Sequence, residues 1–231
     1  MLLDIFSSFD EQNFTLFSKI PLIWLMGSLP LYYIQSTFWI SFSRWYALVI
    51  KLKSFMITQA SRTKGSDIGG FNNIIISIFL MLVISNLLGL SPYVFSTTSH
   101  LVFSFVFGLP LWLTLVLSGL FFNPKAMISH FLPSGAPSAL NPFLVLVETV
   151  SINVRPITLS IRLTANMSAG HIILGLIGAY LSTGIFFYSS VIIFILTLVE
   201  IFYFIFEVGV SMIQAYIFSL LITLYSDDHP N

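Results

Sequence analysis

Three charge-free apolar segments, separated by turn-rich stretches, occupy the first part of the chain. Residues 20–42, 71–90 and 101–122 are apolar and hold no Lys, Arg, Asp or Glu. Each has the length of a membrane-spanning helix, about 20 residues. The stretch 91–99 between the last two is rich in Ser, Thr and Pro, as expected of a turn. The pattern therefore predicts one spanning helix over 20–42 and a helical hairpin over 71–122.

Residues 44–67 follow a different pattern, in which basic and apolar residues alternate at helical spacing. The apolar positions recur three and four residues apart, which is typical of a helix with one apolar face; they are Trp45, Leu48, Val49, Leu52, Phe55 and Met56. We expect an amphipathic helix that lies on the membrane surface. Five of the nine Lys and Arg residues lie between positions 44 and 64, and basic residues gather on the inner side of a membrane. Counting crossings from this helix places the N-terminus outside, and Lys125 and the C-terminus inside.

Two much longer apolar segments, 138–180 and 185–225, make up the rest of the chain. Each would be roughly 60 Å long as one helix, twice the hydrocarbon layer of ~30 Å. Neither contains a polar loop at which it could cross again, so strong tilt is the simplest interpretation. Ser182-Thr183-Gly184 is the predicted turn between them. We therefore predict an all-α membrane protein, with 1–231 as a single membrane domain of about five membrane helices plus one interfacial amphipathic helix. Its last two helices (138–225) form a long, strongly tilted hairpin.

The composition supports a protein embedded in lipid. Hydrophobic residues make up 57% of the 231 residues and charged residues only 8%, whereas soluble domains contain about 25% charged residues. The mean hydropathy is +0.96. A formal net charge of zero argues against a nucleic-acid partner, which needs a basic excess.

The same inventory excludes several kinds of site. No cysteine is present, which rules out disulfides, thiolate metal sites and cysteine nucleophiles. No glycine-rich phosphate loop of the Walker type occurs, so no nucleotide site is predicted. We expect neither a cofactor nor a metal ion.

Ionisable residues inside the two long segments are the candidates for function, because a charge at the centre of a spanning helix costs ~2.5–3.5 kcal/mol on insertion scales. Residues seven apart share one helix face, since seven residues turn a helix by about 700°. The first segment carries Glu148, Arg155 and Arg162 at this spacing and Asn166 one turn further, and the second carries Glu200, Glu207 and Gln214. Pro156 can interrupt the first stripe. His171 lies about 180° around the helix from Arg162, so the two side chains must face different surroundings.

The side-chain types suggest a proton pathway divided by a fixed positive charge. Arg162 stays charged at any physiological pH, so it cannot relay protons, but it can attract a carboxylate of a neighbouring subunit and block a direct leak. Imidazole changes charge near neutral pH and carboxylates taken out of water titrate closer to it, so both can relay protons. Glu148 and Arg155 can instead form a structural ion pair, and Glu200 can either line a channel or join an ion pair.

Three stretches resemble one known family. They are Arg162-Leu-Thr-Ala-Asn166-Met-Ser-Ala-Gly170-His171 within residues 148–171, Asn86-Leu-Leu-Gly-Leu-Ser-Pro92, and Glu207-Val-Gly-Val-Ser-Met-Ile-Gln214-Ala-Tyr216. These stretches resemble subunit a of F-type ATP synthases in its mitochondrially encoded form, and the first is highly specific. The similarity runs from residue 70 onward, while residues 1–70 match in layout only.

The resemblance implies roles for individual residues. The family's essential arginine falls on Arg162, and its polar residue one turn later falls on Asn166. The mitochondrial pairing of His on one long helix with Glu on the other falls on His171 and Glu207; bacterial relatives generally exchange the two types. Other polar positions of the family fall on Glu148, Gln214 and, less generally, Glu200.

The resemblance further implies a function and a location. The family supplies the non-catalytic stator subunit of the membrane Fo sector, which forms two proton half-channels against a rotating c-ring and couples proton flow to ATP synthesis. Glu148 would line the inner path, and the outer path would be lined by His171, Glu207, Gln214 and Glu200. Expected partners are the c-subunit ring, peripheral-stalk subunit b, small membrane subunits, membrane lipid and protons. The expected location is the mitochondrial inner membrane, with the N-terminus on the intermembrane-space side and the C-terminus on the matrix side.

Two other classes of function remain open. A proton-coupled secondary transporter also carries intramembrane charges but usually has internal repeats, and we find none in the sequence. A structural membrane subunit of a respiratory complex would need no arginine on a long tilted helix. Replacing Arg162 with Ala separates these classes, because only the rotary function predicts loss of ATP-coupled proton transport with assembly retained.

Overall fold

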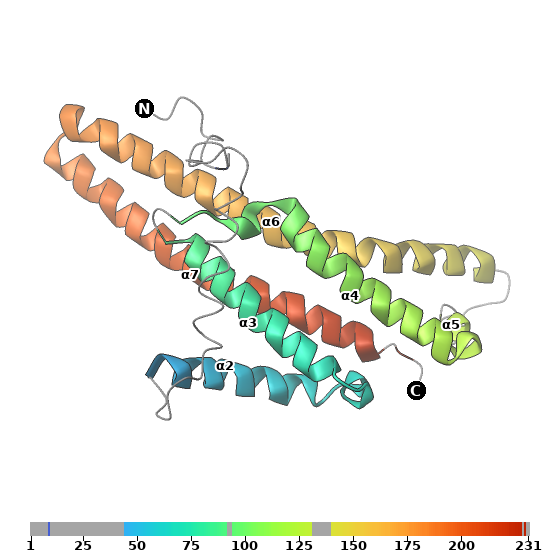
Figure 1. Ribbon diagram of the computed structural model, residues 1–231. Helices are drawn as coiled ribbons and strands as arrows, with labels where there is room; N and C mark the ends of the chain where they lie inside the picture. Colours follow the sequence, from blue (N-terminus) through green and yellow to red (C-terminus); the bar gives the residue numbers. More distant parts are fainter. Residues whose placement is uncertain (1–8, 10–43, 92–93, 131–139, 228, 230–231) are drawn as a thin grey trace, which may run out of the picture. The chain divides into compact units, whose positions relative to one another are not determined.

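The described part of the chain is built from helices. The computed structural model describes residues 9, 44–91, 94–130, 140–227 and 229, and no β-strand occurs among them. The helices are α2 (Arg44–Ala60), α3 (Phe71–Gly89), α4 (Leu101–Phe122), α5 (Pro124–His130), α6 (Asn141–Phe187) and α7 (Ser190–Asp227), with the short 3₁₀ helices η3 (Lys64–Asp67) and η4 (Thr97–Ser99) (Figure 1).

Four of the described helices, α3, α4, α6 and α7, are long and apolar enough to cross a membrane. They confirm the predicted all-α membrane fold, and α3 and α4 confirm the two helices expected over 71–122. The predicted first spanning helix, 20–42, lies outside the described residues. After α4, the Asn123 side chain accepts a hydrogen bond from the Ala126 backbone N–H at 3.4 Å. Asn123 therefore caps the short α5, which the sequence analysis did not predict.

The predicted amphipathic helix over 44–67 is shorter than expected. α2 ends at Ala60, and η3 follows from Lys64. A side chain on Gly65 would overlap Ser226 and Phe71, and the Lys64 backbone N–H donates to Asp227 Oδ1 at 2.7 Å. These contacts with the end of α7 and the start of α3 hold the segment in a tighter conformation than an α-helix allows. Its position on a membrane surface stays a prediction.

The predicted turn at Ser182-Thr183-Gly184 is wrong. α6 continues to Phe187, and α7 begins at Ser190. The Ser182 and Thr183 hydroxyls donate to the Ala179 carbonyl at 2.9 and 3.1 Å, so both residues satisfy their polar groups within the helix instead of breaking it. The Tyr188 N–H donates to the Gly184 carbonyl at 2.8 Å, and the turn between the two helices follows at residues 188–189.

The two C-terminal helices are far longer than a bilayer is thick. α6 has 47 residues and α7 has 38, which at ~1.5 Å per residue corresponds to about 70 and 57 Å. A hydrocarbon layer is ~30 Å thick, so the lengths agree with the predicted tilt. α6 also continues through Pro156, so the proline does not interrupt the stripe that carries Glu148, Arg155 and Arg162.

The described residues divide into two compact units. The first unit contains the described parts of 1–42 and 81–100, together with 163–215; the second contains 43–80, 101–162 and the described part of 216–231. In the second unit, Ser104 of α4 donates to the Ser160 carbonyl of α6 at 3.1 Å. Small residues and hydroxyls of this kind let membrane helices approach closely.

In the first unit, residues 163–187 of α6 and 190–215 of α7 lie side by side as a helical hairpin (Figure 1). The C-terminal end of α3 joins them, because Asn86 Nδ2 donates to the Ser211 carbonyl of α7 at 3.2 Å. Three helices of different sequence position therefore meet in this unit, and the predicted pair His171 and Glu207 lies among them.

Candidate proton-transfer site

A carboxylate packed against a glycine forms the centre of the candidate site. Glu207 of α7 is only 3% exposed. A Cβ atom added to Gly170 of α6 would overlap both carboxylate oxygens and the carboxyl carbon of Glu207. Gly170 itself is buried. The missing side chain at position 170 therefore provides the space that Glu207 occupies.

His171 follows Gly170 and brings an imidazole to the same part of the α6–α7 hairpin. Its Nε2 atom lies 3.9 Å from the place that a Cβ atom on Gly89 of α3 would take. The Phe9 ring approaches the imidazole edge-on, with 6.3 Å between the ring centroids. The imidazole of His171 therefore lies close to the C-terminal end of α3.

Glu207 is buried and His171 is half-buried, and each has a buried polar atom that lacks a hydrogen-bond partner within the described residues. Within the described residues, neither Glu207 Oε2 nor His171 Nε2 has a hydrogen-bond partner, and Tyr203 precedes Glu207 by one turn of α7. Buried polar atoms are nearly always paired with protein or water. A buried carboxyl group and a half-buried imidazole with open bonding positions can pass protons through water.

The remaining predicted residues of the first unit are less enclosed. Asn166, Glu200 and Gln214 are half-buried. Glu200, Glu207 and Gln214 repeat every seven residues along the continuous α7, so they share one helix face as predicted. Among the three, only Glu207 is fully buried.

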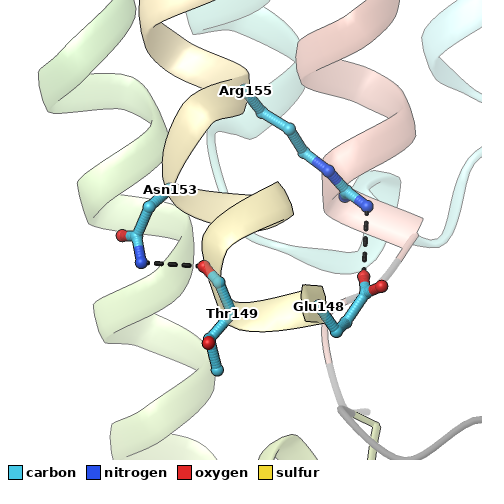
Figure 2. Close-up of polar contacts among 4 residues, drawn as sticks. All are labelled: Glu148, Thr149, Asn153 and Arg155. Carbon is cyan, nitrogen blue, oxygen red and sulfur yellow. Dashed lines mark hydrogen bonds and ion pairs between the residues drawn. The ribbon is translucent and has the colours of Figure 1, made fainter. Parts of the chain in front are cut away.

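Arg155 and Glu148 lie together in the second unit. Arg155 Nη2 is 3.4 Å from Glu148 Oε1, and the side chains are 29% and 40% exposed. The Arg155 guanidinium also lies over the Tyr225 ring, 5.3 Å from its centroid. Figure 2 shows the single contact between the two charged groups. The two side chains therefore form an ion pair, although one long contact between partly exposed groups is weak.

Arg162 has different surroundings from Arg155. It is exposed on α6, as is Ile161, while Leu159 and Leu163 are buried. Within the described residues Arg162 has no ion-pair partner, since Glu148 contacts Arg155 instead. A permanent charge on the open face of an apolar helix is costly in lipid, and a partner outside this chain would lower that cost.

Three residues of this site were missed by sequence reasoning. Gly170 contacts Glu207, Tyr203 precedes it by one turn of α7, and Asn86 joins α3 to α7. Asn86 offered a signal, because it is an amide near the end of a largely apolar span, far from Asn72 and Asn73 at the start of that span. Gly170 offered no such signal. A glycine within a helix indicates close packing against a neighbouring helix only when the side chain that faces it is known.

Comparison of the sequence with known proteins identifies one family. The model of the family "ATP synthase A chain" matches residues 14–227. ATP synthase subunit a of Locusta migratoria is 39% identical over 229 residues, and the subunits a of Drosophila melanogaster and Aedes aegypti are 38% and 36% identical over 232 residues. Each alignment covers 99% of both chains. The chain therefore belongs to the ATP synthase A chain family and is a proton-transporting subunit of the membrane sector of an ATP synthase.

Proposed function

We propose that the chain is the stator subunit that passes protons through two half-channels on either side of Arg162, against a rotating ring of c subunits. The observation that carries this proposal is the contrast between two kinds of charged site. Arg162 is exposed and has no ion-pair partner among the described residues, whereas Glu207 is buried beside Gly170. A fixed charge that faces outward suits a carboxylate on another chain, and an enclosed titratable pair suits a proton path.

The proposed transport cycle uses these groups in order. Protons enter through the outer half-channel, lined by His171, Glu207, Gln214 and Glu200, and neutralise a ring carboxylate that then turns into the lipid. After one rotation the carboxylate releases its proton to the inner half-channel beside Glu148. Arg162 stabilises the deprotonated carboxylate between the two events, with Asn166 one turn further along α6. A membrane potential supplies ~2.3 kcal/mol per charge per 100 mV, which drives the rotation.

The proposed surroundings follow from the family and the charge distribution. Insect relatives and the His171–Glu207 pair support the mitochondrial inner membrane. Lys51, Lys53 and Lys125 are exposed, and basic residues favour the inner side. This distribution supports a C-terminus in the matrix and an N-terminus in the intermembrane space. Peripheral-stalk subunit b and small membrane subunits complete the set of proposed partners. No observation favours the secondary transporter or a purely structural subunit.

Cysteine cross-linking tests the ring-facing surface directly. The chain contains no cysteine, so a single introduced cysteine reports without background. Ala165→Cys, on the exposed face just after Arg162, is expected to form a disulfide with a cysteine placed beside the ring carboxylate. Thr164→Cys, whose side chain is buried, is the matched control and should react much less. Strong disulfide formation by Thr164→Cys with none by Ala165→Cys would show that another face of α6 meets the ring.

Replacement of His171 by Leu tests the outer path. We expect slower ATP-driven proton pumping in assembled enzyme, because the change removes a proton carrier and makes its buried surroundings apolar; general acid–base groups typically contribute about 10²–10⁴-fold. His100→Leu, outside the spanning helices, is the control and should pump normally. Unchanged pumping in His171→Leu would reduce this histidine to a packing role.

A further inference from the structure

Asn86 of α3 is an amide buried without full hydrogen bonding in the first unit. Its side chain is 0% exposed. Nδ2 donates to the Ser211 carbonyl of α7 at 3.2 Å, while Oδ1 has no hydrogen-bond partner within the described residues. A carbonyl oxygen can only accept, so the amide nitrogen must face Ser211 and the amide oxygen must point elsewhere. The Ser211 bond thus fixes the direction of a free acceptor.

The position of Asn86 links it to both titratable groups of the site. Ser211 lies four residues after Glu207 on α7, so the two share one helix face. Gly89 lies three residues after Asn86 on α3, and the place that a Cβ atom on Gly89 would take is 3.9 Å from His171 Nε2. The face of α3 that carries Asn86 therefore meets α7 beside Glu207 and α6 at His171. Three buried polar atoms from these facing helices have no hydrogen-bond partner within the described residues: Asn86 Oδ1, His171 Nε2 and Glu207 Oε2.

We propose that Asn86 is a further positioning residue of the proton path, and that its amide oxygen accepts a hydrogen bond from the water that serves Glu207 and His171. This inference rests on the proposed function. An amide does not titrate at physiological pH, so Asn86 neither gains nor loses a proton; it orients the water that does. A residue needed only to clamp α3 to α7 would use its N–H donor alone and would leave a buried acceptor unsatisfied, which is unfavourable.

Two substitutions at this position separate the water-orienting role from a clamp. Asn86→Leu and ionised Asn86→Asp both lack the N–H donor to Ser211, but only Asp keeps an oxygen acceptor, and it adds a titratable group to the unit that holds Glu207 and His171. In vesicles containing assembled ATP synthase, we expect Asn86→Leu to slow pumping by about fivefold to tenfold, the order of one lost hydrogen bond. We expect Asn86→Asp to pump faster than Asn86→Leu and to shift the outer-side pH profile by about one unit, because a new carboxyl interacts with nearby charges.

The control substitution is the neighbouring Ser85→Ala. Ser85 is 7% exposed and its hydroxyl bonds only within α3, to the Leu82 carbonyl at 3.1 Å, so this variant should keep the normal rate and profile. Equal losses in Asn86→Leu and Asn86→Asp with an unchanged pH profile would show a clamp and overturn the proposal. Failure of both Asn86 variants to assemble would do the same. An Arg162→Ala enzyme assayed alongside separates failure of the Asn86 proposal from failure of the proposed stator function. Retained coupling in Arg162→Ala would refute the stator function itself.

Discussion

An Arg162→Ala enzyme is expected to assemble normally and to lose at least about two orders of magnitude of ATP-driven proton pumping, the usual cost of removing one preorganised charge-stabilising group. Arg162 is exposed on α6 and has no ion-pair partner among the described residues, so its loss leaves the packing of this chain intact. What it removes is the proposed counter-charge for the ring carboxylate and the barrier between the half-channels. Pumping is measured by dye quenching in vesicles, and assembly by native electrophoresis.

Two further variants define what Arg162 contributes. Arg155→Ala removes the other arginine of the same helix face, which contacts Glu148 and lies over the Tyr225 ring within this chain, and should retain coupled pumping. Arg162→Lys keeps a positive charge but loses the planar fork of donors, and should fall between wild type and Arg162→Ala. Normal coupling in Arg162→Ala, or equal losses in Arg155→Ala and Arg162→Ala, would contradict the stator function.

Gly170→Ala is expected to reduce pumping about as strongly as loss of the Glu207 carboxylate, roughly 10²-fold for a proton-transfer group. The added Cβ would overlap the carboxylate of Glu207. The overlapping atoms are the end of a flexible side chain, so the Glu207 carboxylate must shift away from its position beside Gly170. Overpacking a buried site of this kind also costs ~1–3 kcal/mol, so thermal stability of the enzyme in detergent should fall as well.

A double substitution distinguishes this steric effect from a general loss of helix packing. Glu207→Asp draws the carboxylate back by one methylene and should restore part of the pumping in the Gly170→Ala background, which gives a favourable coupling energy in a double-mutant cycle. Gly175→Ala is the matched control, because nothing lies within 4 Å of a Cβ atom there; it should behave as wild type. Normal pumping in Gly170→Ala, or no rescue by Glu207→Asp, would contradict the steric explanation.

Helix boundaries were predictable where apolar runs ended in clear polar stretches, and less so elsewhere. The bounds of α4 agree with the predicted 101–122, because Asn123 ends the apolar run and caps the next helix. The turn predicted at Ser182-Thr183-Gly184 failed because a Ser or Thr hydroxyl can bond either a turn or its own helix. The sequence alone does not indicate which of these hydrogen bonds forms. In the structure the Ser182 hydroxyl donates to the Ala179 carbonyl, within the helix.

The sequence by itself determined the all-α membrane class, the family, and the charged positions along the two long helices. It did so because charge in an apolar run is expensive and therefore stands out. Only the tertiary structure decided which of these residues are buried and what they face. Glu148 contacts Arg155 and leaves Arg162 unpaired among the described residues, and Glu207 fits against Gly170. Such contacts depend on the distance and rotation between helices, which helical periodicity within one segment does not specify.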